Sequence, residues 1–464
     1  MNVIAVPMPP RPFEQIVLTR LFDDLAVSGI PHAVLRNHED LPVRLGARDL
    51  DLLVAPEELK TTLWVITRLA RDYGLSIANY YADERMVQVA LAGRRERRMF
   101  DLKIDLFTSS QVYGIELMPA EEMLRDLRRH NDIPVVSDAV VLLDKWLFHL
   151  AVGKPLHAKY DPLFARIAGD HEGRILEKLV PLLGEREAGA QISAMKAGRS
   201  SSITLTPWRR LRLLVSTSAR RPGRRLPLMG RFLTSRLGDR LRPHGLCLSI
   251  SGPDGSGKTT VIDLALAQLR QIYGEDSIVY RHFRPAALPR IAEVARATGT
   301  GGEVDADYSR PHRAQPSGLF GSLGRLGYYA LDYLAGYVIG VRPLIRQRRI
   351  VVFDRYYHDM ICDPGRSRIG LPDRWLMAVG WMLPLPELSF FIRVAPATAH
   401  GRKQELTLAQ IAALNSRYED LVERGWMIEI GNEGPPEQAA NAIVDHVVGR
   451  FGKRARRAMQ EVAS

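Results

Sequence analysis

Residues 249–266 read SISGPDGSGKTTVIDLAL, an apolar strand that breaks into a glycine-rich turn and then resumes as a helix. Within this segment, Gly252, Gly257, Lys258 and Thr259 fit the pattern G-x-x-x-x-G-K-[ST] without a mismatch. Such glycines let backbone N–H groups face phosphates, while the following helix N-terminus and the lysine add positive charge. We therefore predict that the loop binds the phosphates of a nucleoside triphosphate, with the Thr259 hydroxyl on Mg²⁺. The predicted binding set also includes Asp254, Gly255, Ser256 and Thr260.

Further apolar stretches follow the loop at the spacing of an alternating α/β domain. The pattern predicts strands at 245–251, 277–283, 349–357, 388–394 and 426–431, with helical segments between them that include 321–346, 373–383, 408–424 and 436–449. This order implies a five-stranded parallel sheet. The stretch VVFD brings Asp354 to the carboxyl end of its strand, the edge at which ligands bind in open parallel sheets. We expect Asp354 to orient Mg²⁺ or its water shell and Arg355 to reach toward phosphate.

The motifs GPDGSGKTT and VVFDRYYHD together resemble thymidylate kinase, and the resemblance covers about residues 244–452. The stretch 385–406 is similar to that family's fourth strand, its proline-containing turn and its basic lid. The resemblance implies transfer of a phosphoryl group from ATP with Mg²⁺. It places Asp254 near the acceptor, and Lys258 and Thr259 at the donor and metal. It further implies that Arg355 contacts the transferring phosphate and that Arg402 and Lys403 close over it. The catalytic residues expected are Lys258, Asp354, Arg355 and Arg402.

The acceptor side departs from the family pattern. RHFRP at 281–285 stands where thymidylate kinases usually carry Arg-Glu-Pro-Gly-Gly, and 358–372 replaces the segment that leads to their base-contacting helix. Four arginines in or near these stretches could clamp a phosphate, or some of them could pair with Asp359 or Asp363. They are Arg281, Arg284, Arg366 and Arg368. We expect a phosphorylated small-molecule acceptor other than thymidylate, and a divergent thymidylate kinase is the alternative. The stretch 309–318 is predicted as an acceptor-side loop.

The N-terminal half carries acidic residues on two predicted strands. Asp49 and Asp51 lie two residues apart, and the strand at 98–107 adds Asp105 together with Asp101. Alternation places the first two carboxylates on one side, and several hard oxygen ligands are what a paired metal site needs. Residues 13–150 resemble the nucleotidyltransferase superfamily on this pattern. However, Arg-Asn at 36–37 replaces the usual Gly-Gly or Gly-Ser pair, so an active domain and a degenerate, substrate-binding or structural one both stay open.

Charge divides the chain as clearly as the motifs do. Residues 201–243 contain eleven arginines and one acid, a net charge of +10 out of +12 for the chain, and the rest is near neutral. We predict a nucleotidyltransferase-like domain at 1–137, a helical extension at 138–200, an arginine-rich linker at 201–243 and the kinase-like domain at 244–464. The linker is either a solvated connector or a peripheral membrane contact through 207–243, where Leu233, Leu237 and Leu241 recur at helical spacing. Nucleic-acid binding is disfavoured because aromatic residues are few in this stretch.

Composition bounds the class of protein. The 464 residues are 46% hydrophobic and 25% charged, which is typical of ordinary globular domains. With only Cys247 and Cys362, a disulfide framework or a cysteine-built metal site is excluded, and a reducing cytoplasm is expected. We predict no signal peptide. The favoured function is ATP- and Mg²⁺-dependent phosphoryl transfer. The alternatives are a nucleotide-binding regulatory or scaffold protein without turnover, and a nucleotidyltransferase with an accessory kinase domain.

Overall fold

The computed structural model describes residues 12–95, 98–219, 227–230, 232–234, 238, 244–285, 288 and 318–463. The chain divides into two compact units, the first comprising Met1–Gly238 with Val448–Ser464 and the second Asp239–Val447. Most of the predicted acceptor-side loop, together with Leu237 and Leu241, lies outside the described residues. None of the described helices is long and apolar enough to cross a membrane.

The first unit is built on a seven-stranded mixed sheet of order β3-β4-β5-β2-β1-β9-β8. Its strands are β1 (His32–Val34), β2 (Leu50–Val54), β3 (Ser76–Ala82), β4 (Met86–Arg95), β5 (Arg98–Phe107), β8 (Leu127–His130) and β9 (Ile133–Val136). A separate hairpin pairs β6 (Ser109–Val112) with β7 (Ile115–Pro119). Helices α1 (Pro12–Val27) and α2 (Leu59–Asp72) share one core with these strands, because apolar residues such as Leu18, Leu21 and Leu25 recur on one side of α1.

A helical layer continues this unit around a second core. Its members are α3 (Ala120–Met123), α4 (Asp138–Val152), α5 (Asp161–Asp170), α6 (Glu172–Leu183), α7 (Glu185–Lys196) and α8 (Pro207–Ala219). The Ser137 hydroxyl caps α4 by accepting from the Val140 N–H, and Gly153 ends the helix at a φ of 75°. Leu213 of α8 is fully buried in this core. The first part of the predicted linker is therefore a packed helix of the N-terminal unit.

The second unit contains a five-stranded parallel sheet of order β11-β12-β10-β13-β14, as the sequence predicts. Its strands are β10 (Leu246–Ser251), β11 (Ile278–His282), β12 (Ile350–Asp354), β13 (Leu388–Arg393) and β14 (Ile428–Gly431). Strand β10 lies in the middle and all its residues are buried, because helices cover both faces of the sheet. The register pairs Ile250 with Asp354, so the loop after β10 and the end of β12 meet at one edge.

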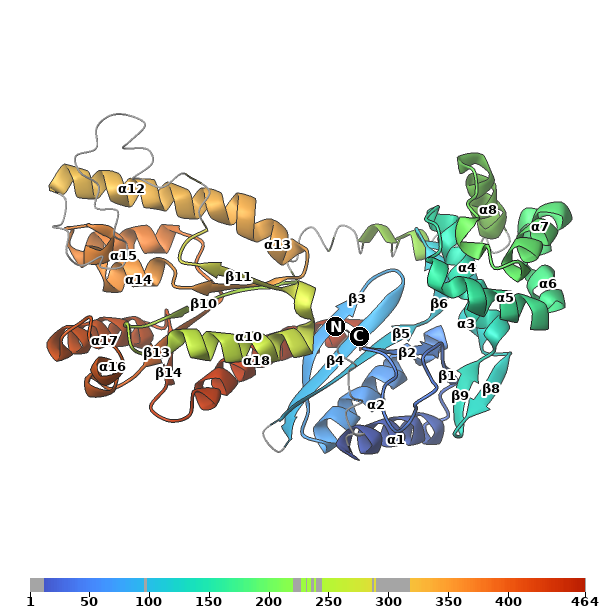
Figure 1. Cartoon of the computed structure of the whole chain (residues 1–464), viewed down its shortest axis with the longest axis horizontal. Coiled ribbons are helices and arrows are strands. Elements are labelled where there is room, and N and C mark those ends of the chain that lie inside the picture. The colour runs from blue at the N-terminus through green and yellow to red at the C-terminus, as the bar shows by residue number, and fades with distance from the viewer. Residues whose placement is uncertain are drawn as a thin grey trace, which may run out of the picture. The chain divides into compact units, whose positions relative to one another are not determined.

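Nine helical segments among the described residues surround this sheet or follow it. They are α10 (Lys258–Tyr273), α12 (Leu319–Gly336), the π-helix Tyr337–Val341, α13 (Arg342–Arg346), α14 (Tyr357–Cys362), α15 (Asp373–Met382), α16 (Pro396–Arg402), α17 (Leu408–Glu423) and α18 (Pro436–Ala463). Short 3-10 helices lie at Glu275–Ser277 and Pro364–Ser367. Figure 1 shows α12 to α15 on one face of the sheet and α10 with α18 on the other.

Helix α18 belongs to both units. Its last part, from Val448 onward, groups with the first unit, where Ala455 is buried in the same core as α1 and α2 and Met459 packs against it. The predicted boundaries had assigned all of 244–464 to the kinase-like domain. The difference arises because the apolar spacing of α18 continues beyond the residues that the second sheet needs, and this continuation packs on a different core.

Candidate phosphate-binding site

The loop between β10 and α10, residues 252–257 and here called the glycine loop, has a backbone conformation that favours glycine at three positions. Gly252, Gly255 and Gly257 have φ values of 150°, 86° and 79°. A Cβ at Gly252 would lie 2.7 Å from the Ile392 carbonyl oxygen, and one at Gly255 would collide with the Ala399 carbonyl oxygen. These glycines therefore let the loop lie directly against neighbouring backbone.

Lys258 begins α10 at the end of the glycine loop and is 8% exposed. Its Nζ donates to the carbonyl oxygens of Gly252 at 2.8 Å and Pro253 at 3.0 Å. Burial, together with the nearby Arg355 guanidinium, lowers the pKa of Lys258 to about 7. The ammonium thus occupies a position that disfavours positive charge unless an anion is nearby. Thr259 and Thr260, in the first turn of α10, are exposed.

Asp254, Arg355 and Arg366 form a chain of ion pairs across the glycine loop. The Arg355 Nη2 donates to Asp254 Oδ1 at 2.7 Å, and Arg366 Nη1 lies 3.5 Å from Asp254 Oδ2. Burial alone would raise the pKa of Asp254, but Arg355, Lys258 and Arg366 outweigh it and hold the pKa below its ordinary value. Asp254 is therefore a carboxylate surrounded by cations.

Sequence reasoning missed Asp359 as a site residue. It is 3% exposed and accepts from Arg355 Nη1 at 3.0 Å, from the Tyr418 hydroxyl at 2.8 Å and from the Ser251 hydroxyl. Arg355 has a φ of 73°, an uncommon conformation for a bulky residue, and Asp359 holds its side chain from the first turn of α14. The spacing of four residues between an arginine and an acid was the available signal.

Asp354 ends β12 with its two oxygens in different surroundings. Oδ2 accepts from the Tyr280 hydroxyl at 3.3 Å and lies 3.1 Å from His282 Nδ1. Burial and Asp354 raise the pKa of Tyr280 to about 12, so the phenol stays a donor at neutral pH. Oδ1 is buried and has no hydrogen-bond partner among the described residues. Such an orphaned carboxylate oxygen, at the edge that also carries Thr259, fits a divalent cation. The sequence signal for Tyr280 and His282 was their alternation on β11.

The predicted clamp of four arginines is not assembled. Arg284 Nη1 lies 2.6 Å from the fully buried Asp332 carboxylate, and Arg281 donates to the Pro285 carbonyl oxygen at 3.4 Å. Arg366 contacts the glycine loop as described above, whereas Arg368 lies in the left-handed region with a φ of 55°. Among these four predicted cations, Arg366 is thus the one that the structure brings to Asp254.

The lid arginine predicted from the resemblance lies near the glycine loop. Arg402, at the end of α16, donates through Nη2 to the Asn432 carbonyl oxygen at 3.4 Å. Its Nη1 lies 3.4 Å from where a Cβ of Gly257 would be. Lys403 pairs with Glu405 at 3.0 Å, and its charge also helps to lower the pKa of Asp254. Asn432 supports the loop by donating to the Ser256 carbonyl oxygen at 2.8 Å.

Asp49, Asp51 and Asp105, here called the acidic cluster, lie in the first unit. Asp51 and Asp105 are register partners on the adjacent strands β2 and β5. Arg36 binds Asp51 with two hydrogen bonds, Nε to Oδ2 at 2.6 Å and Nη2 to Oδ1 at 3.1 Å. Gln88 donates to Asp105 at 2.8 Å, while burial raises the pKa of Asp105 to about 6.

No group of three or more His, Cys, Asp and Glu side chains within the described ranges is arranged to hold a metal ion. Ligation of a metal by the acidic cluster stays a prediction, and the Arg36 ion pair counts against it. Arg36 comes from the Arg-Asn pair that replaces the expected glycines. Its guanidinium already neutralises Asp51, which lowers the need for a bound cation.

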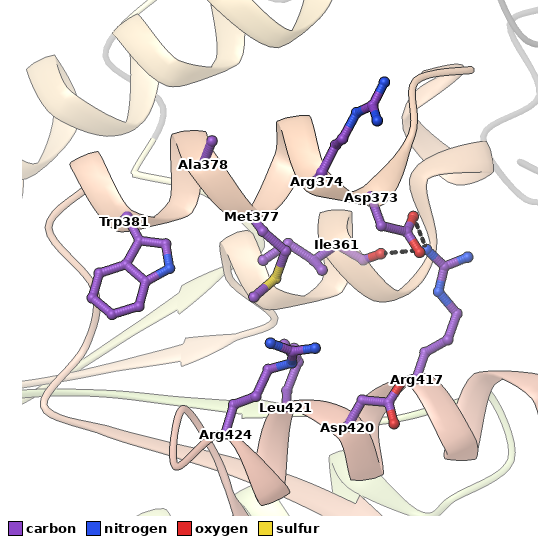
Figure 2. Close-up of a pocket in the computed structure, with 10 residues that line it drawn as sticks. All are labelled: Ile361, Asp373, Arg374, Met377, Ala378, Trp381, Arg417, Asp420, Leu421 and Arg424. Carbon is purple, nitrogen blue, oxygen red and sulfur yellow. Dashed lines mark hydrogen bonds and ion pairs between the residues drawn. The ribbon is translucent and has the colours of Figure 1, made fainter.

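Apart from the glycine loop, a hollow of about 510 Å³ lies between α14, α15 and α17 (Figure 2). Arg417 crosses one end of it, donating to the Ile361 carbonyl oxygen at 2.9 Å and to Asp373 at 2.5 Å. Met377 and Leu421 form apolar walls, and Trp381 is 76% exposed. Asp373 already pairs with Arg417, while Arg374 and Arg424 also line this hollow.

Comparison with known proteins gives distant matches. No protein-family model matches the chain. A protein named "Probable thymidylate kinase" from Pyrobaculum aerophilum is 26% identical over 155 residues, which are 33% of this chain and 68% of the relative. The thymidylate kinase of Leuconostoc mesenteroides subsp. mesenteroides is 24% identical over 181 residues, 37% of this chain and 75% of the relative. That of Xanthomonas campestris pv. campestris is 27% identical over 167 residues, 35% of this chain and 62% of the relative, less than two thirds of its length.

Among solved structures, the crystal structure of thymidylate kinase from Ehrlichia chaffeensis matches with a TM-score of 0.31 and 18% identity. The match covers 44% of this chain and 99% of that chain. The relatives named here are thymidylate kinases, and the comparisons give no support to the nucleotidyltransferase resemblance. The chain is thus distantly homologous to thymidylate kinases over about a third of its length.

Proposed function

We propose that the second unit transfers a phosphoryl group from ATP, with Mg²⁺, to a phosphorylated small molecule other than thymidylate. The observation that carries this proposal is the convergence of buried cations on the glycine loop. Lys258, 8% exposed, and Arg355, 6% exposed, lie beside the N-terminus of α10. The lowered pKa of Lys258 means that this arrangement is electrostatically incomplete without an anion. A polyphosphate chain supplies that anion.

Each side chain then has a distinct part in the reaction. Lys258 would neutralise charge on the donor phosphates, while Arg355, fixed between Asp254 and Asp359, would stabilise charge that develops on the transferring group. Asp354 Oδ1 and the Thr259 hydroxyl would hold Mg²⁺, which supplies charge neutralisation for the phosphate oxygens. Arg402 would complete the enclosure from α16. Catalysis by this site is positioning and charge stabilisation, with no covalent enzyme intermediate.

The acceptor follows from what surrounds Asp254. Arg366, from the segment that departs from the thymidylate kinase pattern, reaches the same carboxylate as Arg355. An arginine fork recognises a phosphate without reading a base, whereas a site that hydrogen-bonds a base rejects analogues lacking the matching groups. We therefore infer an acceptor whose phosphate lies between Arg355 and Arg366, such as a nucleotide other than thymidylate or a sugar phosphate.

A screen of acceptors with γ-labelled ATP tests this proposal. The full chain is incubated with thymidylate, other nucleoside monophosphates and sugar monophosphates, with Lys258→Ala as the control for contaminating kinases. We expect label to enter at least one acceptor more efficiently than thymidylate. A kcat/KM for thymidylate of about 10⁴ M⁻¹s⁻¹ or more, unmatched by other acceptors, would show a divergent thymidylate kinase instead. ATP binding without transfer to any acceptor would favour the regulatory or scaffold alternative.

A further inference from the structure

Helix α8 of the first unit has two unlike faces. Leu213 and Thr217, four residues apart, are buried in the helical core. Trp208, Leu211 and Val215 recur at intervals of three and four residues on the other side, and they are 76%, 49% and 57% exposed. The helix therefore has apolar residues on two opposite faces, one buried in the helical core and one exposed.

Helix α8 carries arginines and no acidic residue of its own. The arginines are Arg209, Arg210 and Arg212. Arg209 pairs with Glu187 at 2.6 Å and Arg210 donates to the Val152 carbonyl oxygen at 3.3 Å, so both fasten the helix to its own unit. Arg212 is exposed. The sequence around the helix, 201–243, has a net charge of +10.

We propose that the outward face of α8 docks the protein on the surface of an anionic phospholipid bilayer. Tryptophan is favoured at the membrane interface, and arginine near an anionic leaflet is attracted to it. At 13 residues the helix is too short to span a bilayer, so it would lie flat with Trp208, Leu211 and Val215 among the headgroups.

Charge sign and shape favour a membrane over other occupants. A protein partner usually meets a rim of both signs, whereas 201–243 contains eleven arginines and a single acid, Asp239. A nucleic acid would leave the three apolar side chains in contact with phosphates and would find one aromatic ring for stacking. A bilayer takes up the apolar stripe and the cations together. This inference stands apart from the phosphotransferase proposal, because none of these residues belongs to the glycine loop.

Vesicle sedimentation of the full chain tests the proposal. Binding is compared between vesicles of phosphatidylcholine alone and vesicles that also contain phosphatidylglycerol, at low and high salt. We expect binding to the anionic vesicles, weakened by salt because screening shortens the reach of the arginines. The double variant Trp208→Ala, Leu211→Ala is expected to weaken the partition coefficient at least about tenfold, since two apolar side chains no longer enter the interface.

Matched changes on α2 serve as controls within the same unit. Trp64 is also exposed, at 56%, and lies under Arg68. Trp64→Ala should leave the partition coefficient unchanged, as should Arg71→Gln, which removes one exposed charge. Arg212→Gln should lower it about fivefold on anionic vesicles. The far-UV circular dichroism and the urea unfolding of each variant report whether the first unit is folded.

Three results would overturn the proposal. The first is the absence of binding to anionic vesicles by the wild-type chain. The second is equal binding by the wild type and the Trp208→Ala, Leu211→Ala variant, because the charge of the chain would then explain association without α8. The third is a dimer in solution that dissociates in this double variant, which would identify the face as a contact between two copies of the chain.

Discussion

The glycine loop of the second unit and the acidic cluster of the first balance their charges in opposite ways. At the glycine loop, Lys258 is bound to two backbone carbonyls, and Asp354 leaves Oδ1 buried without a partner within the described part of the chain. In the acidic cluster, Asp51 receives both arms of Arg36 and Asp105 receives the Gln88 amide. The glycine-loop site therefore keeps charged groups that a ligand could compensate, whereas the charges of the acidic cluster are nearly all compensated within the fold.

This difference teaches how an acid-rich motif should be judged. Folding tolerates a buried, unsatisfied polar group at a cost, and such groups gather where a ligand completes them. Both sites carry aspartates on strands, and the sequence pattern of each suggests a metal. The partner that each carboxylate finds in the fold separates them, because a guanidinium within the fold takes the place that a metal cation would have.

The largest expected effect on ATP turnover comes from removing the charged side chains of the glycine-loop site. Lys258→Ala should abolish ATP turnover, and Asp354→Asn should lower it at least about a hundredfold, because charge stabilisation of the transition state is lost. Asp49→Asn in the acidic cluster should leave turnover within about twofold. Turnover of ATP with the preferred acceptor is measured for each folded variant. Near-normal rates for both of the first two variants would remove the kinase assignment.

The pKa of Lys258 predicts a proton-linked binding step. In the unliganded fold the pKa is about 7, so the amine is mostly neutral at pH 8. Nucleotide phosphates favour the ammonium and raise the pKa again, so binding should take up as much as about one proton at pH 8, and affinity should fall as pH rises above 7. In the unliganded chain, the lowered pKa of Lys258 reduces the free energy of unfolding. This loss grows as the pH falls from 10.5, the pKa of the unfolded lysine, to about 7, and it is complete below 7.

Calorimetry of ADP binding in buffers of different ionisation enthalpy measures this uptake. Lys258→Met retains the length of the apolar stem without the amine, so the buffer dependence should disappear. An equally large proton uptake in that variant would assign the proton to another group. The acidic cluster offers no such linkage to the nucleotide, which sharpens the contrast between the two sites.

Tyr280 and His282 should have a smaller effect, because they hold Asp354 without completing its charge. Tyr280→Phe with His282→Gln frees Oδ2 and lets the carboxylate rotate, so we expect kcat to fall about tenfold and the Mg²⁺ concentration for half-maximal rate to rise. Initial rates over a Mg²⁺ titration measure both quantities. A fall in kcat with an unchanged Mg²⁺ requirement would indicate that these residues act elsewhere than through Asp354.

The second sheet was predictable from sequence because its signals are local. Each parallel strand is a short apolar run, and the glycine loop announces itself by residue type. The long-range pairings could not be predicted in this way. Asp359 and Tyr418 are separated along the chain and meet through packing of α14 on α17, and Arg284 turns to Asp332 because that carboxylate is fully buried. The spacing of the arginines along the chain does not indicate which of them forms an ion pair with a distant carboxylate.

The first unit was predicted less completely. The strand at 98–107 has the bounds that alternation predicts, and the predicted helical extension at 138–200 contains α4, α5, α6 and α7. The neighbouring strand β4, which pairs with β5 along its length, was missed because its apolar residues do not alternate simply. The partner of Asp51 was missed for another reason. Arg36 stands where a glycine is expected, and its separation of 15 residues from Asp51 along the chain gives no sign that the two side chains pair.

The smallest expected effect concerns the acidic cluster, and it tests whether Arg36 replaces a metal. Arg36→Met leaves the buried Asp51 beside Asp105 with no guanidinium, so we expect the free energy of unfolding to fall by about 3 kcal/mol. The exposed pair of Arg44 and Asp40 provides the control, since Arg44→Met should cost less than about 1 kcal/mol. Urea denaturation, followed through the unfolding transition of the first unit, measures both losses of stability.

Added Mn²⁺ turns this loss into a test of the comparison itself. If Arg36 stands in for a cation, Mn²⁺ should raise the Tm of Arg36→Met and leave that of the wild type unchanged, because only the variant has an uncompensated carboxylate pair. These measurements are made with Asp354→Asn present in both chains, so that the kinase site contributes no metal response. A wild-type Tm that rises with Mn²⁺, and no longer does so when Asp49→Asn and Asp51→Asn are added, would mean that the acidic cluster binds metal despite Arg36. In that outcome both sites would bind a metal ion, and metal-dependent chemistry in the first unit, which its aspartates suggest, would again be a candidate function.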